Sequence, residues 1–372
     1  MSQPHKPKIC LFLPSLNMGG AERLTINLAN EWNNLGYEVE FVIIKSHNVN
    51  DLSSLVSEDI NISFLNKKRL INAIPSIIKH LLSSRPSVSL VAMWPLTVIC
   101  VIAWLFSGKK GKLFLSDHTQ MSISMLHEIN SSKFIVQISI FLFYNLSSGV
   151  IAVSQGVKDD LCKLGRLNTN FVKVIHNPAS LKKGSYKYHD NQDPFKKIWK
   201  NAGKKILAVG TLKEQKDFKT FIRAINEISS EIKVSAIIVG EGPERDDLQD
   251  LINQYDLSNR IFLAGFIMDP RIYFHFADLF VLSSAWEGFG NVIVEALENG
   301  TQVVSTNCKS GPSEILDNGR FGKLVPIKDH RAMADAIENS FLFDHDPEPL
   351  IERSKLYAVG KVAKKYIDYF LA

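Results

Sequence analysis

Residues 283–297 read SSAWEGFGNVIVEAL, with one glutamate, Glu287, before a glycine-rich turn and a second, Glu295, after it. The short apolar run at 278–282 predicts a buried strand, and residues 292–297 predict a helix that is apolar on almost every side. Such a helix belongs in a protein interior. A carboxylate there must be paired, neutralised or directed at a ligand, so we expect Glu295 to have a partner.

The turn between the two glutamates predicts an anion site. Gly288 and Gly290 flank Phe289 and free the backbone just before the helix. Their N–H groups, together with the helix N-terminus near Asn291, can bind a phosphate. Simpler interpretations stay open for the carboxylates, because the first could cap the helix and the second could meet a core arginine.

Two glutamates in this arrangement around Gly-Phe-Gly resemble the glutamate pair of retaining GT-B glycosyltransferases of the family-four type, which use nucleotide-sugar donors. The resemblance implies that Glu287 faces the donor sugar and that Glu295 holds the ribose hydroxyls of the nucleotide. It also implies that the backbone from Gly288 to Asn291 binds the donor diphosphate. The resemblance covers nearly the whole chain and is most specific from 277 to 316.

The same resemblance implies an α/β chain with the GT-B fold, in which two Rossmann-like domains face a central cleft. Residues 1–180 would form an N-terminal acceptor-binding domain, and residues 205–353 a C-terminal nucleotide-sugar-binding domain. The polar, lysine-rich segment 181–204 is typical of an interdomain linker, and the alternative of a nucleic-acid patch lacks a fold motif. Residues 354–372 would form a helix that returns to the N-domain.

Length and composition fit this interpretation. A chain of 372 residues favours two domains, and 45% hydrophobic with 22% charged residues is ordinary for a globular protein. The net charge of +5 suggests acidic ligands or an anionic membrane surface rather than a nucleic-acid partner. The four cysteines are far apart without metal-like spacing, so we expect neither a disulfide framework nor a zinc site, and we expect a reducing cytoplasm.

One segment could be mistaken for a membrane span. Residues 88–106 are apolar for almost the length that a bilayer requires, but Trp94-Pro95 divides them into a strand-length piece and a helix-length piece. We therefore expect a strand and a buried helix. Residues 9–13 are too short for the apolar region of a signal peptide.

Residues 133–146 are unusually hydrophobic, and two interpretations of them stay open. Most helices of this composition lie in a core. The alternative is a surface that touches the bilayer, assisted by Lys109, Lys110 and Lys112 if these lie on the same side.

The N-terminal domain offers two candidate site residues. A strand at 8–13 leads into a double-glycine turn that lacks the dinucleotide fingerprint and alone would only ease the backbone. The turn resembles the family's Gly-Gly-Ala-Glu loop, which implies that Gly20 approaches the donor diphosphate. His118 follows Asp117 and a predicted strand at 112–115. A histidine there is more often structural, but its position resembles the family's N-domain histidine, which implies sugar positioning rather than metal binding.

The C-terminal domain offers a cation. A strand at 205–209 ends in Gly210, after which the family usually has an arginine and, five residues later, a lysine that together neutralise the diphosphate. Lys216 matches the lysine, but Thr211 replaces the arginine, and Lys213 could compensate. The alternative for the matching lysine is an exposed side chain without a role.

A further loop, formed by Gly265, Phe266 and Ile267, matches the family's contact with the nucleotide base. That contact is made largely by backbone groups in the family, so it does not identify the base.

Together these residues imply transfer of a sugar from a UDP- or GDP-linked donor to a hydroxyl of a saccharide or polyprenyl-linked saccharide, with retention at the anomeric carbon. The expected setting is the biosynthesis of a surface polysaccharide such as lipopolysaccharide or capsule. The protein would be cytoplasmic, with peripheral contact at the inner face of the plasma membrane.

We expect no metal and no cofactor. The lysine, the turn amides and the helix dipole can meet the developing negative charge of the leaving diphosphate. Metal-dependent transferases of the other common fold use a paired-aspartate loop, and the one such spacing, Asp344-His345-Asp346, is expected at the surface.

Three other functions are alternatives to sugar transfer. A GT-B epimerase or phosphorylase would share the fold. The presence of the residues expected at the site, His118, Lys216, Glu287 and Glu295, argues against a non-catalytic protein that binds sugar nucleotides. A nicotinamide dehydrogenase would need the dinucleotide fingerprint that is missing after the first strand.

Overall fold

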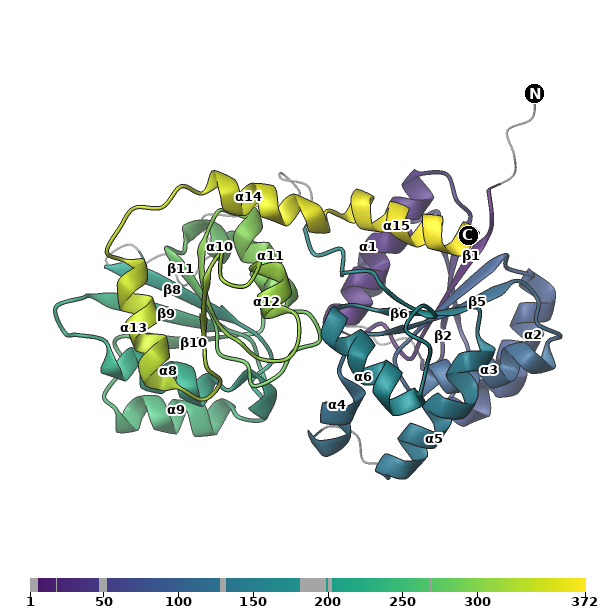
Figure 1. Cartoon of the computed structure of the whole chain (residues 1–372), viewed down its shortest axis with the longest axis horizontal. Coiled ribbons are helices and arrows are strands. Elements are labelled where there is room, and N and C mark those ends of the chain that lie inside the picture. Colours follow the sequence, from purple (N-terminus) through teal and green to yellow (C-terminus); the bar gives the residue numbers. More distant parts are fainter. Residues whose placement is uncertain are drawn as a thin grey trace. The chain divides into compact units, whose positions relative to one another are not determined.

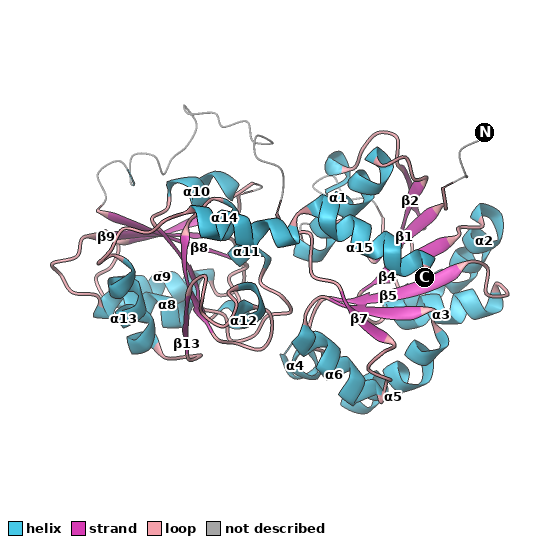
Figure 2. Ribbon diagram, turned by 45° about the horizontal axis from the view of Figure 1, so that its top comes forward, coloured by secondary structure: helices cyan, strands magenta, loops and turns pink. Residues whose placement is uncertain are grey.

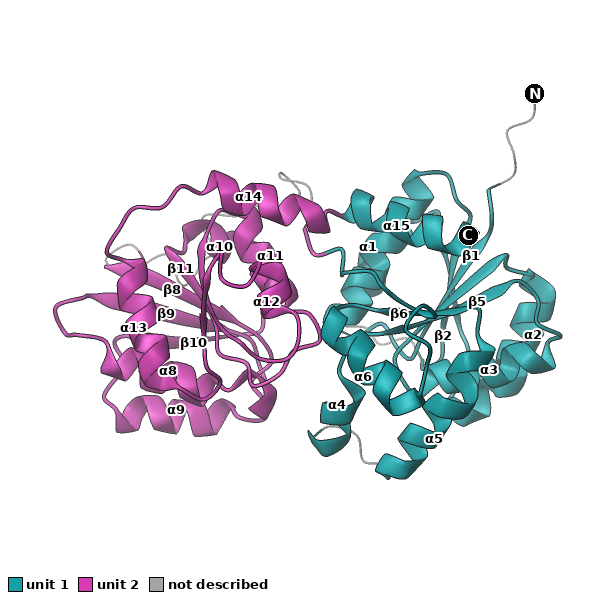
Figure 3. Cartoon of the chain, viewed as in Figure 1, with its two compact units in different colours: residues 1–178, 359–372 teal, residues 179–358 magenta. Residues whose placement is uncertain are grey.

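The computed structural model describes residues 6–17, 19–46, 52–127, 132–180, 199, 203–267 and 269–372. The chain divides into two compact units (Figure 3): residues 1–178 with 359–372 form unit 1, and residues 179–358 form unit 2. The predicted linker, 181–204, lies almost entirely outside the described residues. The returning helix begins at Val359 rather than at 354, because the backbone is extended at Ala358 and interrupts the helical path.

Unit 1 is built on a parallel sheet with the strand order β3-β2-β1-β4-β5-β6-β7 (Figure 1). Its strands are β1 (Ile9–Leu13), β2 (Val39–Ile43), β3 (Asn61–Phe64), β4 (Val88–Ala92), β5 (Lys112–Asp117), β6 (Gly149–Ala152) and β7 (Val172–Val174). Its helices are α1 (Gly20–Asn34), α2 (Ile74–Ser84), α3 (Leu96–Phe106), α4 (Met121–His127), α5 (Lys133–Phe143), α6 (Gln155–Gly165) and α15 (Val359–Leu371). Helices cover both faces of the sheet (Figure 2), which explains the continuous apolar runs in its central strands.

Helix α15 closes the core of unit 1. Its Tyr366 and Phe370 pack against Trp32 of α1, each with a ring-centroid distance of 5.9 Å. Phe370 also meets Phe114 of β5 at 4.8 Å. The indole N–H of Trp32 donates a hydrogen bond of 3.1 Å to the carbonyl of Ala363. Helix α15 therefore completes the hydrophobic core to which β1 and α1 contribute.

Residues 88–106 fold as the sequence predicted, with β4 and α3 divided at Trp94-Pro95. Helix α3 is buried over most of its length. Among the described residues, no helix combines the length and the apolar character needed to cross a membrane.

Unit 2 holds a second parallel sheet, with the strand order β10-β9-β8-β11-β12-β13. Its strands are β8 (Lys204–Val209), β9 (Val234–Val239), β10 (Ile261–Gly265), β11 (Leu279–Leu282), β12 (Gln302–Thr306) and β13 (Lys323–Val325). Its helices are α8 (Phe218–Glu227), α9 (Arg245–Gln254), α10 (Arg271–Phe276), α11 (Asn291–Glu298), α12 (Pro312–Ile315), α13 (His330–Ser340) and α14 (Glu348–Ser354).

The order of the strands in unit 2 reverses between β8 and β11. The chain runs from β8 through β9 to β10 on one side, and then returns to place β11 on the other side of β8. Ligands of open α/β sheets bind beyond the carboxyl ends of the strands at such a reversal. The loops that follow β8 and β11 carry Lys216 and Glu287. Unit 1 has the same reversal between β1 and β4, and Gly20 lies just after β1.

We expect Phe370→Ala to lower the free energy of unfolding of unit 1 by about 3–5 kcal/mol, because the ring is fully buried among aromatic side chains. Leu371→Ala is the control, since this neighbour on the same helix is 57% exposed and should change stability by less than about 0.5 kcal/mol. Urea denaturation of the full chain, followed by tryptophan fluorescence, measures both. Equal effects of the two substitutions would contradict the packing of α15.

Candidate active site

The loops after β8 and β11 are tied to each other by hydrogen bonds. Ser283 Oγ donates to the carbonyl of Lys216 at 2.7 Å, and Ala285 N donates to the carbonyl of Gln215 at 2.8 Å. Gln215 Nε2 in turn donates to the carbonyl of Trp286 at 3.0 Å. These bonds fix the two loops side by side at the point where the strand order reverses.

This arrangement brings together two residues that the sequence analysis singled out separately. Lys216 Nζ lies 2.5 Å from Glu287 Oε1, and Ser284 Oγ donates to the same oxygen at 2.7 Å. Glu287 is only 7% exposed. A buried carboxylate is stable only with such partners, and removing one partner of a buried pair typically costs about 3–5 kcal/mol. Lys216 is therefore not the exposed lysine of the alternative interpretation.

Glu287 does not cap the following helix. The N-cap residue of α11 is Gly290, which makes no side-chain cap, and the carboxylate of Glu287 is engaged by Lys216 and Ser284. The capping interpretation of this glutamate is therefore wrong. Gly290 has no side chain that could cap α11, and a helix N-terminus is a position that favours an anion.

Glycines shape the turn as the sequence predicted. Gly290 has φ +99°, a backbone conformation that L side chains rarely adopt. Gly311, with φ +101°, supports the turn from the loop after β12, and a Cβ there would lie 1.9 Å from the carbonyl oxygen of Phe289. Gly210 leaves room for Lys216, because a Cβ there would lie 3.1 Å from three side-chain carbons of the lysine.

The sequence predicts a helix at 292–297 that is buried on almost every side. In the structure, one side of helix α11 is partly accessible. Asn291, Glu295 and Asn299 lie four residues apart along a partly accessible stripe, so Glu295 is only partly buried. The deeply buried carboxylate is Glu298, which is 6% exposed and accepts a hydrogen bond of 2.9 Å from Ser180 Oγ. The sequence analysis missed Glu298, because an acidic residue at a helix end usually suggests exposure.

The other residues predicted for this site lie at the same edge of the sheet. Gly265 ends β10 with φ +78°, Phe266 beyond it is half exposed, and Ile267 is partly buried. Thr211 is exposed directly after β8 and its carbonyl accepts a hydrogen bond from Lys213 N at 2.8 Å. A nucleotide bound at this edge would contact the loops after β8, β10 and β11.

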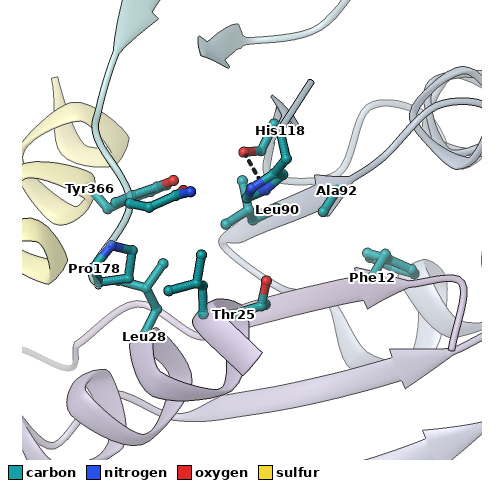
Figure 4. Close-up of a pocket in the computed structure, with 11 residues that line it drawn as sticks. Phe12, Thr25, Leu28, Leu90, Ala92, His118, Pro178 and Tyr366 are labelled. Atoms are coloured by element: carbon teal, nitrogen blue, oxygen red, sulfur yellow. Dashed lines mark hydrogen bonds between the residues drawn. The ribbon is translucent and has the colours of Figure 1, made fainter. Parts of the chain in front are cut away.

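In unit 1, His118 lies at a cavity beyond the carboxyl end of β5 (Figure 4). The cavity is lined mainly by apolar side chains of β1, β4 and α1, together with Ser116, Asn177 and Tyr366. His118 Nε2 is 3.2 Å from Ser116 Oγ, whereas the buried Nδ1 has no hydrogen-bond partner in the part of the chain that the structure describes. Leu24 and Thr25, one turn after Gly20, line the same cavity, so the two predicted residues of this unit lie near each other.

Burial lowers the pKa of His118 to about 4, so the ring is neutral near pH 7 and offers one donor and one acceptor. Asp117 does not orient this ring, because successive side chains of a strand point to opposite faces. Asp117 instead accepts a hydrogen bond of 2.8 Å from Tyr144 on the other face. Burial raises the pKa of Asp117 to about 6.

The structure also gathers Cys10, Glu40 and His80, whose possible ligand atoms all lie within 4.8 Å of one another. These are ligand types for transition metals. The carboxylate of Glu40, however, already has a cation in Lys8 at 3.1 Å and a hydrogen-bond partner in His80 at 2.9 Å. Burial opposes its ionisation, but the hydrogen bonds from His80, Ser84 and Lys8 prevail and lower the pKa of Glu40 to about 2. Cysteine spacing could not reveal this cluster, because its members come from β1, β2 and α2.

The paired-aspartate spacing lies at the surface of unit 2. Asp344, His345 and Asp346 lie in an exposed loop, where His345 Nε2 is 2.7 Å from the carbonyl of Gly300 and Asp346 accepts from Glu348 N at 3.0 Å. This loop is the surface turn that the sequence predicted. The four cysteines are free.

Two doubly wound units, one with a paired lysine and glutamate beside a glycine turn at its strand reversal, define a class of two-domain α/β proteins suited to nucleotide diphosphate ligands. Family comparison gives the particular family. The model described as Glycosyltransferase Family 4 matches residues 18–183, and that described as Glycosyl transferases group 1 matches residues 190–356. The chain belongs to the family-four glycosyltransferases.

Known relatives agree. The N-acetylgalactosamine-N,N'-diacetylbacillosaminyl-diphospho-undecaprenol 4-alpha-N-acetylgalactosaminyltransferase of Campylobacter jejuni is 26% identical over 387 residues, which cover 98% of this chain and 99% of the relative. The lipopolysaccharide core biosynthesis glycosyltransferase LpsE of Rhizobium meliloti is 34% identical over 162 residues, 44% of this chain and 46% of the relative.

Solved structures confirm the predicted GT-B fold. Anabaena Alr3699/HepE in complex with UDP matches with a TM-score of 0.80 and 19% identity, covering 97% of this chain and 98% of that one. The lipopolysaccharide outer core galactosyltransferase WaaB in its apo form matches with a TM-score of 0.75 and 17% identity, covering 98% and 99%.

We expect the His118 ring to titrate with a midpoint near pH 4, because burial disfavours its charged form. Since the pKa is lower in the folded chain than in the unfolded chain, His118 favours the folded state fully above about pH 6.5, and this contribution is lost as the pH falls through about 4. NMR of the histidine ring carbons, assigned with His118→Gln, measures the midpoint. A midpoint near 6.5 would show that the ring is open to water.

Proposed function

We propose that this glycosyltransferase moves a sugar from a UDP- or GDP-linked donor to a hydroxyl of a saccharide or polyprenyl-linked saccharide, with retention at the anomeric carbon. The observation that carries the proposal is the ion pair of Lys216 and Glu287 beside the Gly290 turn, at the strand reversal of unit 2. A cation, a carboxylate and a helix N-terminus in one place suit a diphosphate attached to a sugar.

The charge of the leaving group decides the chemistry. When the bond between the anomeric carbon and the diphosphate oxygen breaks, negative charge develops on the diphosphate. Lys216, the backbone N–H groups of residues 288–291 and the N-terminus of α11 would stabilise that charge without reorganising. The acceptor oxygen would bond to the anomeric carbon on the face from which the diphosphate leaves, and a phosphate oxygen would take the acceptor proton. A strong protein base is then not needed.

The remaining residues would position the donor. Glu287 would orient the sugar and stabilise its oxocarbenium-like centre, and Glu295, on the accessible stripe of α11, would hold the ribose hydroxyls. Gly265, Phe266 and Ile267 would contact the base. In unit 1, neutral His118 would hydrogen-bond a sugar hydroxyl, and Gly20 would approach the diphosphate. Thr211 would donate a hydroxyl where the family usually supplies an arginine.

The relatives support the choice of substrates. The name of the Campylobacter jejuni enzyme describes an alpha-linked transfer to an acceptor carried on diphospho-undecaprenol, and LpsE is named for lipopolysaccharide core biosynthesis. The HepE structures contain UDP and UDP-glucose. We therefore favour a lipid-linked acceptor in the assembly of a surface polysaccharide, and we propose a cytoplasmic protein with peripheral contact at the inner membrane face.

A GT-B epimerase or phosphorylase is the alternative activity. Either would act without a saccharide or lipid-linked saccharide as hydroxyl acceptor, and would release isomerised donor or free sugar. Incubation of UDP- and GDP-sugars with and without a panel of lipid-linked acceptors separates the possibilities, because a transferase requires the acceptor for rapid nucleotide release.

We expect Glu287→Gln to lower kcat by at least about 100-fold, because the amide keeps the shape of the side chain but removes the charge at the sugar. Glu338→Gln is the control. This glutamate accepts from Ser229 N, just before β9 and therefore at the amino edge of the same sheet, where no part of the proposed site lies. Radiolabelled sugar transfer measures both variants. Near-normal transfer by Glu287→Gln would contradict the assignment.

We expect transfer to continue in excess EDTA, because Lys216 and the turn amides would meet the diphosphate charge without a divalent cation. The rate before and after dialysis against chelator, and after Mg²⁺ or Mn²⁺ is restored, measures this. A rate that falls on chelation and returns with the metal would overturn the metal-independent part of the proposal.

A further inference from the structure

The outward face of helix α5 is more apolar than its inward face. Val136, Ser139 and Ile140 are buried against unit 1. Five large apolar side chains point outward and are 38–69% exposed, namely Phe134, Ile135, Ile138, Phe141 and Leu142. They occur at the spacing i, i+1, i+4, i+7 and i+8, which places them on one side of the helix, so α5 presents apolar side chains to solvent as well as to the core.

Leu146, which is 43% exposed, follows one turn beyond Leu142 in the 3-10 helix Tyr144–Leu146. We call these five residues and Leu146 the α5 surface. No aspartate or glutamate occurs from residue 132 to residue 158. A contiguous exposed apolar patch of this kind marks an interaction site rather than ordinary surface.

The inward face holds α5 in place. Trp94 Nε1 donates to Ser139 Oγ at 3.0 Å, and a Cβ at Gly165 of α6 would lie 2.6 Å from Ile140 Cγ2. Tyr144, directly after α5, donates to Asp117, the neighbour of His118. The α5 surface is therefore a fixed part of unit 1, the proposed acceptor-binding unit, rather than a helix displaced from a core.

We propose that the α5 surface docks on a lipid bilayer; this rests on the proposed function, because a lipid-linked acceptor lies in a bilayer. Helix α5 has 11 residues and is about 16 Å long, which is too short to span a membrane but long enough to lie in the interfacial layer with its apolar face inserted. A stable protein partner would require about 800 Å² on each side, far more than one face of a helix of this length offers.

Two of the three lysines named for the bilayer interpretation contact other groups of unit 1. Lys112 Nζ donates to the carbonyl of Phe370 at 3.1 Å, and Lys109 Nζ lies over the ring of Trp104 at 5.8 Å. Within α5 itself, Lys133 is the cationic residue, and Gln137 is the other exposed polar one. Docking therefore depends on apolar insertion more than on attraction to anionic lipid.

The test is co-sedimentation of the full chain with phosphatidylethanolamine–phosphatidylglycerol vesicles in 0.1 M salt. We expect Phe134→Ser with Leu142→Ser to lower the partition coefficient at least tenfold, because two large apolar side chains no longer insert. Leu342→Ser with Phe343→Ser is the matched control, since it removes one leucine and one phenylalanine that are 63% and 79% exposed in unit 2. The control should bind as the unsubstituted chain does.

Three results would overturn the proposal: an unsubstituted chain that stays in the supernatant, an α5 variant that binds as tightly as the unsubstituted chain, or a control that loses binding equally. A dimer that the α5 variant abolishes, without vesicle binding, would assign the surface to a second copy instead. Raising salt to 0.5 M should lower binding less than the α5 substitutions do.

Calorimetric titration of the same proteins with UDP and GDP separates this proposal from the proposed function. The α5 variant should bind nucleotide as the unsubstituted chain does, because the α5 surface and the nucleotide-binding residues lie in different units. Vesicle binding without any nucleotide binding would contradict the proposed transferase function but would support docking of the α5 surface on a bilayer. Nucleotide binding without vesicle binding would do the reverse.

Discussion

The ion pair between Lys216 and Glu287 is the interaction on which the site depends. A carboxylate at 7% exposure cannot remain ionised without a close cation or donors, and here it has both within 2.7 Å. The pair is possible only because β8 and β11, distant in sequence, are neighbours in the sheet. The reversal of strand order thus supplies the location, and the two loops supply the charges. The glycine turn before α11 then adds donors without adding side chains.

Unit 1 contributes a different kind of environment. Its cavity is mainly apolar, and burial keeps His118 neutral near neutral pH. A neutral imidazole can position a hydroxyl through hydrogen bonds. In the proposed function, unit 1 would position a hydroxyl through His118, and unit 2 would compensate the diphosphate charge through Lys216. The exposed face of α5 adds a third property to unit 1, an apolar surface fixed beside the strand ends.

The sequence predicted much of this architecture, because buried parallel strands are apolar runs and their loops carry glycine and charge. The strands predicted at 8–13, 112–115 and 278–282 and the division at Trp94-Pro95 follow directly from such patterns. Lys216 and Glu287 were predicted individually through the family resemblance, but their contact was not, since it depends on which strands are neighbours. Gly20 and His118 were likewise predicted separately, and the structure relates them only through α1, which begins at Gly20 and whose Leu24 and Thr25 line the cavity at His118.

Other features could not be predicted for definite physical reasons. Helix α5 is apolar around its whole circumference, so no periodicity shows which face is inward. In α11 the buried carboxylate is Glu298 rather than Glu295. Glu298 accepts a hydrogen bond from Ser180, which is distant in sequence, at the start of unit 2. Asp117 precedes His118 in the sequence, but its side chain accepts a hydrogen bond from Tyr144, a partner that the local pattern does not reveal. Burial of a charged side chain follows from its partners, and partners distant in sequence are not visible in a local pattern.

The most direct test of the central claim is a crystal structure of the full chain with UDP bound. The account predicts the diphosphate at the N-terminus of α11, with a phosphate oxygen within ion-pair distance of Lys216 Nζ, and the ribose hydroxyls against Glu295. A nucleotide bound elsewhere, with no phosphate oxygen in contact with Lys216, would contradict the account.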